Sequence, residues 1–179
     1  MQISKTIVDI RTQLNRIYSP STKVAVVPTM GNLHEGHLAL VKEAKKLADY
    51  VVVTIFVNPT QFVAGEDFDN YPRTLTEDLA LLAELDVDLV FTPDTAEIYS
   101  DDLIKAEVTV PELDGIYCGE FRLGHFKGVA TIVLKLFNII QADLALFGQK
   151  DYQQLLIIKS LITSLNLPIE SIGFPIISK

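Results

Sequence analysis

The sequence contains no tryptophan and only one cysteine, Cys118. A single cysteine excludes an internal disulfide and fits a reducing compartment, so we expect a cytoplasmic protein. Positive charge is also scarce, because 15 Lys and Arg stand against 23 Asp and Glu, which gives a net charge of −8. This balance argues against nucleic acid as the main partner. A small anionic ligand remains compatible with it, since local donors can outweigh net charge.

Long hydrophobic runs are absent as well. No apolar stretch approaches the ~18 residues that a membrane-spanning helix needs. The N-terminus carries Lys5, Asp9 and Arg11 at helical intervals instead of the apolar core of a signal peptide. We therefore expect no membrane partner. Hydrophobic residues still make up 49% of the 179 residues, which is enough for one domain with a substantial core.

Segments with the patterns of strands and helices alternate along the chain. Short β-branched runs read as buried strands, and stretches with apolar residues three and four apart read as helices. Such alternation predicts an α/β fold with a mostly parallel, doubly wound sheet. The predicted helices are 4–17, 36–48, 76–85, 126–140 and 151–165, and the predicted strands are 23–27, 50–57, 88–91, 106–110, 142–146 and 169–173.

The motif His34-Glu35-Gly36-His37 follows the first buried strand and a turn that contains Gly31. A strand, a turn and a helix start form the place where α/β sheets bind phosphate, because the helix N-terminus offers unpaired N–H groups and a positive dipole end. Two imidazoles three residues apart lie on the same side of that first turn. Gly36 has no Cβ, so we expect a flat ligand to approach the backbone there.

Two other interpretations of this pair of histidines stand beside the first. They fit zinc, but a structural zinc site normally needs four protein ligands, and the sequence offers only one further histidine, His125, and one cysteine. They also fit ordinary histidines on a helix surface. Their position directly after a buried strand favours the phosphate site, because ligands of α/β sheets bind at the carboxyl ends of the strands.

Two further segments follow predicted strands and carry polar side chains. Asn58 and Gln61 have neutral amides that both donate and accept hydrogen bonds, which suits a small polar substrate, although Asn58 before a proline is also typical turn chemistry. In the second segment Gly148 lets a ligand approach, and Lys150 is a compact cation for phosphate oxygens. Asp151 fits either a ribose contact or the cap of the next helix.

Three weaker signals complete the set. The segment 122–129 places a histidine and a lysine between two glycines, and a solvated basic loop is its favoured interpretation. Arg73 fits either an anion contact or an ordinary surface side chain. Glu77 and Asp78 occupy the first turn of a predicted helix, where acids are favourable, and a magnesium role is a further hypothesis for them.

These segments together resemble the pantothenate synthetase (pantoate–β-alanine ligase) family. The His-x-Gly-His motif alone marks only the wider HIGH-motif nucleotidyltransferase superfamily, whereas the ordered set is highly specific. The matching segments are 28–37, 56–62, 71–74, 124–129 and 147–154. The resemblance implies a Rossmann-like fold and an enzyme of pantothenate biosynthesis, within the coenzyme A pathway, which adenylates pantoate with ATP and then joins it to β-alanine.

The resemblance also implies roles for individual residues. Catalysis falls to His34, His37 and Lys150, which would contact the ATP phosphates, and pantoate binding falls to the residues Met30, Gln61 and Gln154. The same likeness implies ATP binding by the residues Met30, Gly31, His37, Phe147, Gly148, Lys150, Asp151 and Ile177. Magnesium would accompany ATP, and a homodimer is implied as well.

The family continues past this point with a Ser-Ser-Arg-Asn segment and a smaller domain that covers the site. The resemblance therefore implies that residues 1–179 form a single N-terminal Rossmann-like ATP- and pantoate-binding domain, and that the C-terminal domain is absent from this chain. Two alternatives follow. The chain alone is a catalytically silent ATP- and pantoate-binding domain, or it is a related nucleotidyltransferase that adenylates a phosphate such as phosphopantetheine. Gln61 and Gln154 suit a small hydroxy acid better, because a phosphate would favour additional Arg or Lys.

Overall fold

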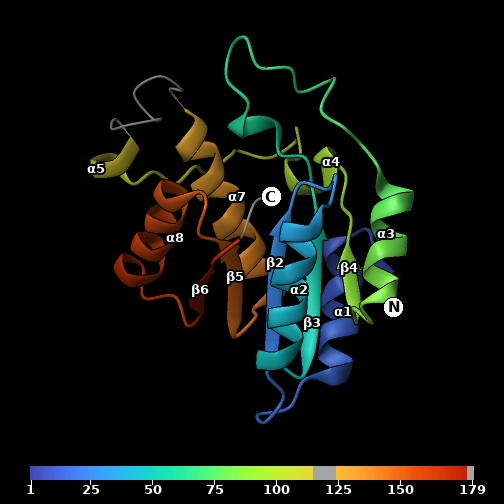
Figure 1. Ribbon diagram of the computed structural model, residues 1–179. Helices are drawn as coiled ribbons and strands as arrows, with labels where there is room; N and C mark the ends of the chain where they lie inside the picture. Colours follow the sequence, from blue (N-terminus) through green and yellow to red (C-terminus); the bar gives the residue numbers. More distant parts are fainter. Residues whose placement is uncertain (115–123, 177–179) are drawn as a thin grey trace.

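The computed structural model describes residues 1–114 and 124–176. A six-stranded parallel sheet forms the centre of the molecule, with helices on both faces (Figure 1), as the alternating pattern predicts. The strands are β1 (Gln2–Ser4), β2 (Val24–Thr29), β3 (Tyr50–Ile55), β4 (Leu89–Phe91), β5 (Leu144–Gly148) and β6 (Glu170–Phe174). The helices are α1 (Ile7–Ile17), α2 (Glu35–Leu47), the 3₁₀ turn η1 (Pro59–Gln61), α3 (Leu75–Glu84), α4 (Thr95–Ile98), α5 (Pro111–Asp114), α7 (His125–Ile140) and α8 (Tyr152–Ser164).

The order of the strands fixes where a ligand can bind. The strand order in the sheet is β1-β4-β3-β2-β5-β6. After β2 the chain adds β3 and β4 on one side of β2, and it then crosses over to add β5 and β6 on the other side. Ligands of open α/β sheets bind outside the carboxyl ends of the strands at such a switch point. The segments after Thr29 and after Gly148 therefore meet at one edge of the sheet.

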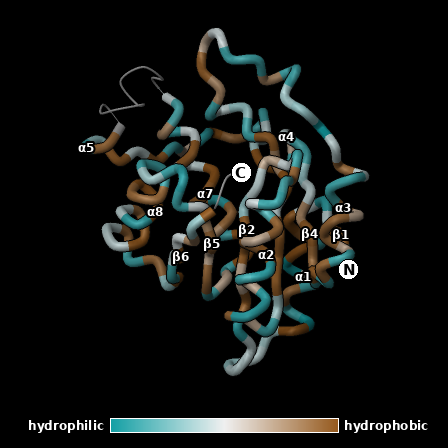
Figure 2. The backbone as a smooth tube through the Cα atoms, viewed as in Figure 1, coloured by the Kyte–Doolittle hydropathy of each residue, from teal (hydrophilic) through white to brown (hydrophobic). Residues whose placement is uncertain are grey.

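Alternate residues of the strands fill two separate cores, one on each face of the sheet. Val26 and Val52 pack with side chains of α1, α7 and α8. Ala25, Val27 and Val53 point to the opposite face and pack with side chains of α2 and α3. Because both faces of the central strands are covered, they are apolar at nearly every position, which appears as a brown centre in Figure 2.

The N-terminus differs from the predicted helix 4–17. Gln2–Ser4 pairs in parallel with Leu89–Phe91 as an edge strand, and the helix begins only at Ile7. The Thr6 side chain caps this helix by accepting the N–H of Asp9. A three-residue strand leaves too short a pattern to be separated from the helical periodicity that follows it.

The strand predicted over 106–110 is also wrong, because this segment is extended but pairs with no strand among the described residues. The Thr131 side chain of α7 takes the place of a neighbouring strand. Its hydroxyl accepts the N–H of Val108 at 3.0 Å and contacts the carbonyl oxygen of Val108 at 3.4 Å. The β-branched pattern thus reflects packing on a helix.

The remaining boundaries agree with the predictions to within two residues, including the strand predicted over 50–57, which ends at Ile55. Residues 62–73 contain neither helix nor strand, and η1, α4 and α5 were not anticipated from the sequence. Each of these three elements is four residues or shorter, so none carries a readable period. Among the described residues, no helix has the length and apolar character that crossing a membrane requires.

Candidate active site

The two histidines of the motif are locked against the first turn of α2. His34 is the N-cap, and its Nδ1 accepts the backbone N–H of Gly36 at 3.0 Å. The Nδ1 of His37 in turn accepts the backbone N–H of His34 at 3.2 Å. The two ring centroids lie 4.1 Å apart. The helix cap therefore holds both imidazoles side by side at the carboxyl end of β2.

These hydrogen bonds also fix the state of the rings. An imidazole nitrogen that accepts a hydrogen bond carries no proton, so in the neutral rings the proton of both His34 and His37 is on Nε2. Burial and, to a smaller extent, the neighbouring His34 lower the pKa of His37 to about 4, and Asp78 opposes them. At neutral pH His37 is therefore an uncharged donor, which suits a phosphate oxygen through a directed hydrogen bond.

The turn that leads into the motif is held by the buried carboxylate of Asp78, which is 2% exposed. Its two oxygens accept the N–H groups of Asn32 and Leu33, each at 2.9 Å. The Thr74 hydroxyl donates to the same carboxylate. Both Gly31 and Asn32 have positive φ, so this turn needs such an anchor. Asp78 is thus a structural support of the turn, and the hypothesis that it binds magnesium finds no support in this geometry.

The glycines of the motifs accommodate side chains of the protein itself. A Cβ on Gly36 would lie 2.8 Å from the His34 ring and 2.8 Å from Ile176. A Cβ on Gly148 would lie 2.4 Å from the Cδ1 of Ile176. Both glycines line the main cavity of the site, so a ligand that approached their backbone would have to displace the Ile176 side chain. Ile176, which the sequence did not single out, lies over both glycines and links the β2 and β5 sides of the site.

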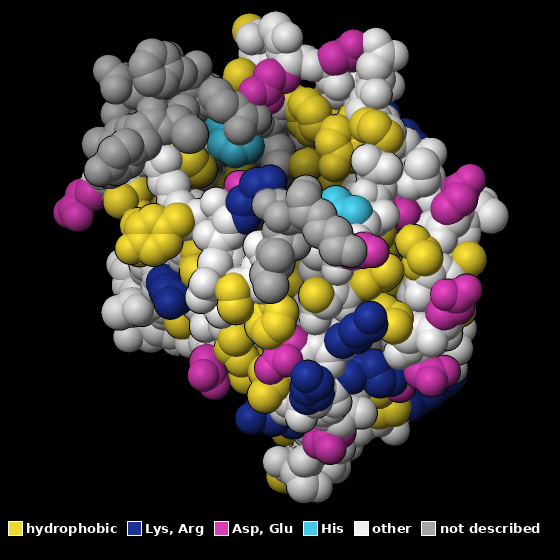
Figure 3. Space-filling model, viewed as in Figure 1, with side chains coloured by type: hydrophobic (Ala, Val, Ile, Leu, Met, Phe, Trp, Pro, Cys, Tyr) yellow, Lys and Arg dark blue, Asp and Glu magenta, His cyan; other side chains and the backbone are white. Residues whose placement is uncertain are grey.

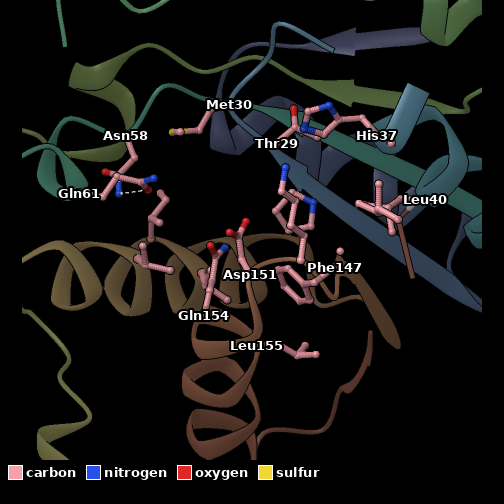
Figure 4. A pocket seen from close by; sticks show the side chains of 18 of the residues that line it. Thr29, Met30, His37, Leu40, Asn58, Gln61, Phe147, Asp151, Gln154 and Leu155 are labelled. Carbon is pink, nitrogen blue, oxygen red and sulfur yellow. Dashed lines mark hydrogen bonds between the residues drawn. The ribbon is translucent and has the colours of Figure 1, made fainter. Parts of the chain in front are cut away.

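The amide pair after β3 is part of the scaffold as well as of the site. Asn58 is 1% exposed and caps η1 by accepting the N–H of Thr60. Its Nδ2 donates to the Oε1 of Gln61 at 3.0 Å (Figure 4). Both interpretations of Asn58, turn chemistry and a role in the site, therefore apply to one side chain.

The β5 side of the site contributes exposed polar groups. Lys150 and Asp151 are exposed, and Gln154 is half-buried one helical turn beyond Lys150. Asp151 is the N-cap of α8 but makes no side-chain capping hydrogen bond. The cap interpretation of Asp151 is therefore not borne out, and its carboxylate is available to a ligand.

The segment after 122 is not a solvated loop over its described part. α7 begins at His125, which is 8% exposed, and the Nδ1 of this ring lies 2.7 Å from the carbonyl oxygen of Gln61. A Cβ on Gly128 would lie 2.4 Å from the carbonyl oxygen of Thr60, so η1 packs directly on the helix backbone. Only Lys127 points outward, where it pairs with Glu107 at 3.2 Å.

A single cavity of about 570 Å³ collects most of the predicted residues. Its lining includes Met30, His34, His37, Gln61, Phe147, Gly148, Lys150, Asp151 and Gln154. In Figure 4 the side chains of Asn58 and Gln61 lie across the cavity from His37, and those of Asp151 and Gln154 approach from α8. Figure 3 shows histidine, basic and hydrophobic side chains adjoining on the face above this end of the sheet.

Two residues predicted to bind ATP are not among the described residues that line the main cavity. Gly31 lines a neighbouring cavity of about 290 Å³, together with Asp78, and not the one that contains the histidines. Ile177 lies outside the described residues. The sequence also missed the apolar wall that α7 gives the main cavity, formed by Val129, Ile132, Val133 and Leu136. The signal was present, since a helix that is apolar around most of its circumference is buried.

Neither a zinc site nor an anion contact by Arg73 is supported by the geometry of the described residues. Among residues 1–114 and 124–176, no group of three or more His, Cys, Asp or Glu side chains is arranged to hold a metal, which removes support for zinc. The guanidinium of Arg73 donates to the carbonyl oxygens of Phe68, Asp69 and Tyr71 and lies 5.0 Å from the Phe68 ring centroid. Arg73 therefore stabilises the loop that contains it.

Comparison with known proteins identifies the family of the chain. Residues 2–179 match the family described as Pantoate-beta-alanine ligase. The chain belongs to the pantoate–β-alanine ligase family. It is 51% identical to the pantothenate synthetase of Acinetobacter baumannii over 99% of this chain and 63% of the relative. A Pseudomonas fluorescens pantothenate synthetase is also 51% identical, over 98% of this chain and 62% of the relative.

Solved structures of the pantoate–β-alanine ligase family share the fold. The pantothenate synthetase of Thermus thermophilus superposes with a TM-score of 0.91 at 43% identity and covers 100% of this chain and 63% of that protein. The Francisella tularensis pantoate–β-alanine ligase, solved with β-γ ATP and β-alanine, has a TM-score of 0.93 at 40% identity and covers 100% of this chain and 68% of that protein. The fold is therefore the Rossmann-like one of these nucleotidyltransferase-like enzymes. This chain spans about 63% of the length of the curated relatives that it matches.

Proposed function

We propose that this protein acts in the ATP-dependent joining of pantoate to β-alanine, through a pantoyl adenylate and with release of pyrophosphate and AMP. The observation that carries the proposal is the composition of the single cavity. It combines two histidines, of which His37 is a neutral donor, and an exposed lysine with amide groups and an apolar wall. The ATP and β-alanine of the related Francisella tularensis structure support the same interpretation.

In the first step a pantoate carboxylate oxygen attacks the α-phosphorus of ATP, and the bond to the β-phosphate oxygen breaks. No general base is required, because a carboxylic acid is already ionised at neutral pH. Negative charge develops on the transferred phosphate and on the leaving pyrophosphate. We assign the stabilisation of this charge to the Nε2–H groups of His34 and His37 and to the ammonium of Lys150. Donors that are held in place before the reaction lower such barriers most effectively.

The pantoate side of the proposal rests on shape and polarity. Pantoate carries two methyl groups on one carbon and has hydroxyl and carboxylate oxygens around them. The wall of Val129, Ile132 and Val133 offers apolar contact for the methyl groups, while Gln61 and Gln154 offer amides for the oxygens. Met30 lines the same cavity. Two amides at this position suit a hydroxy acid better than a phosphate, which would favour additional Arg or Lys, and this disfavours phosphopantetheine.

In the second step the amine of β-alanine attacks the acyl carbon, the bond to AMP breaks, and one proton leaves the amine. The two substrates must be held together with water excluded, and such positioning supplies much of the rate in bimolecular chemistry. We assign the ribose to Asp151 and the nucleoside to the backbone near Phe147 and Gly148.

Magnesium is proposed as the counter-ion of the ATP phosphates. Mg²⁺ is usually held by one or two carboxylates together with substrate phosphates and water. The described residues offer no dedicated cage of acidic side chains, and this donor set fits an ion that arrives bound to ATP. Glu35 and Asp151 are carboxylates that line this cavity.

The test is pyrophosphate release by this chain with Mg-ATP, with and without pantoate. Release that depends on pantoate, together with trapping of the acyl adenylate by hydroxylamine, is the expected result. Tight binding of pantoate and ATP without release would identify a binding domain whose catalysis needs further protein. Release that is independent of pantoate, or that is driven by phosphopantetheine, would contradict the proposal.

We propose in addition that the chain forms the N-terminal ATP- and pantoate-binding unit of a cytoplasmic homodimeric enzyme. The use of ATP and the single cysteine support a reducing interior. The exposure of Leu103 and Ile104, at 69% and 102%, supports a self-association surface, because neighbouring exposed apolar side chains mark interaction sites. Light scattering of the purified chain tests the dimer, and a monomer at all concentrations would contradict it.

A further inference from the structure

The orientation of the buried Asn58 amide is dictated by two backbone groups that cannot exchange roles. The N–H of Thr60 can only donate, and it lies 3.4 Å from Asn58 Oδ1. The carbonyl oxygen of Gly128 can only accept, and it lies 3.2 Å from Asn58 Nδ2. A flipped amide would place donor against donor and acceptor against acceptor, and such mismatches are costly for a side chain that is 1% exposed.

This orientation determines which end of Gln61 meets the ligand. Asn58 Nδ2 donates its second hydrogen to Gln61 Oε1 at 3.0 Å. The Nε2 group of Gln61 cannot replace Oε1 there, since both nitrogens are donors. Gln61 lines the cavity, so its NH₂ end is the one left for a ligand. The site is thereby set to recognise an acceptor oxygen.

Tyr99 contacts Asn58 at the oxygen end of its side-chain amide. Its hydroxyl donates to Asn58 Oδ1 at 2.9 Å, and the Thr60 hydroxyl donates to the same oxygen at 2.9 Å. The ring is held by Phe56, at a centroid distance of 6.2 Å, and by Lys135 Nζ, which lies 5.1 Å from the ring centroid. Tyr99 itself lines a separate cavity of about 380 Å³ behind η1. Burial raises the pKa of Tyr99, so the hydroxyl keeps its proton.

We propose that Tyr99 is a positioning residue of the pantoate subsite: through Asn58 it holds Gln61 with its NH₂ toward an oxygen of the substrate. The name of the substrate rests on the proposed function, whereas the relay from Tyr99 to Gln61 does not. Tyr99 acts without contacting the substrate. Its removal therefore weakens recognition of pantoate and leaves ATP binding unchanged.

The relay is tested first without any ligand. In ¹H–¹⁵N spectra of this chain, the side-chain NH₂ pair of Gln61 is identified by its loss in Gln61→Met. Tyr99→Phe is expected to shift this pair and to speed its exchange with solvent, while the matched control Tyr18→Phe, at a side chain 76% exposed, leaves it unchanged. An unaltered Gln61 pair in folded Tyr99→Phe protein would overturn the relay.

The second arm is a double-mutant cycle on pantoate binding, measured by calorimetry. Tyr99→Phe is expected to raise the pantoate Kd about threefold to tenfold, the range for one net hydrogen bond, and to leave the ATP Kd within about twofold. In the Gln61→Met background the same change should have no further effect. Equal losses in both backgrounds would mean that Tyr99 is merely structural, and would overturn the proposal. If the unmodified chain bound no pantoate while the spectra behaved as expected, the proposed function would fail and the relay would stand.

Discussion

The two sides of the cavity differ in how their polar groups are held. On the β2–β3 side, His34, His37 and Gln61 are each fixed by a hydrogen bond from a neighbouring backbone or amide group. On the β5–α8 side, no hydrogen bond or ion pair within the described part of the chain fixes the side chains of Lys150 or Asp151. One side is thus ordered before a ligand arrives, and the other must be ordered by the ligand.

This difference indicates a division of labour. Groups held in place in advance stabilise developing charge without reorganisation, so they contribute most to the chemical step. Long exposed side chains lose rotamer freedom when they bind, which offsets part of their attraction for phosphate. We therefore expect substitutions on the β2–β3 side to impair rate and selectivity, and substitutions of Lys150 and Asp151 on the β5–α8 side to impair mainly ATP affinity.

The largest effect is expected at His34. His34→Asn keeps an acceptor for the Gly36 N–H but removes the Nε2–H donor, and pyrophosphate release should fall about 10²- to 10³-fold. In His34→Ala the rate of pyrophosphate release should fall as far. The free energy of unfolding should also fall by about 1 kcal/mol, because the helix loses its N-cap. Rates of release and urea unfolding measure the two effects. Full activity in His34→Asn would remove His34 from the chemical step.

Gly128→Ala tests how firmly the β2–β3 side is built. An alanine normally stabilises a helix interior by up to about 1 kcal/mol relative to glycine. Here the added Cβ would lie 2.4 Å from the backbone oxygen of Thr60, so we expect a lower Tm and weaker pantoate binding. Gly173→Ala is the control, because its Cβ would meet only side-chain atoms of Leu155 and Gln149. A stabilised Gly128→Ala protein with normal pantoate affinity would show that η1 has room to shift.

Substitutions of Lys150 test the β5–α8 side of the cavity. Lys150→Arg keeps the charge on a long exposed side chain and should change the ATP Kd by less than about threefold, since nothing in the site fixes the ammonium to one position. Lys150→Met should raise the ATP Kd about tenfold, with pantoate affinity unchanged. Calorimetry with a non-hydrolysable ATP analogue measures both. A Lys150→Arg protein as impaired as Lys150→Met would mean that this side is as strictly arranged as the first.

The smallest effect concerns pH and His37. The pKa of this ring is about 4 in the folded chain and 6.5 for an ordinary imidazole, so the unfolded chain binds more protons between these values. The stability that His37 contributes is therefore complete above pH 6.5 and is lost as the pH falls toward 4. His37→Gln, which preserves an acceptor at this position, should show a shallower loss of Tm over that range. Parallel Tm curves for the two proteins would contradict the low pKa.

Much of this site could be predicted because its chemistry is local in the sequence. His34 and His37 follow a readable strand and form their cap within four residues, and Lys150 follows the next strand at the same sheet edge. The role of Asp78 could not be read, because its hydrogen-bond partners lie 45 and 46 residues away. The same holds for Ile176 over Gly36 and Gly148, and for Thr131, which replaces a strand beside Val108. Contacts between distant segments depend on the packed fold and leave no periodic signal.

A crystal structure of this chain with a stable analogue of pantoyl adenylate would show directly which side of the cavity holds each half of the intermediate. We expect the pantoyl group to lie between Gln61 and Gln154 against the α7 wall. We also expect the phosphate to lie within hydrogen-bond distance of the Nε2 atoms of His34 and His37. A pantoyl group bound beside Lys150, or outside this cavity, would contradict the assignment of an ordered side and an open side to the two halves of the reaction.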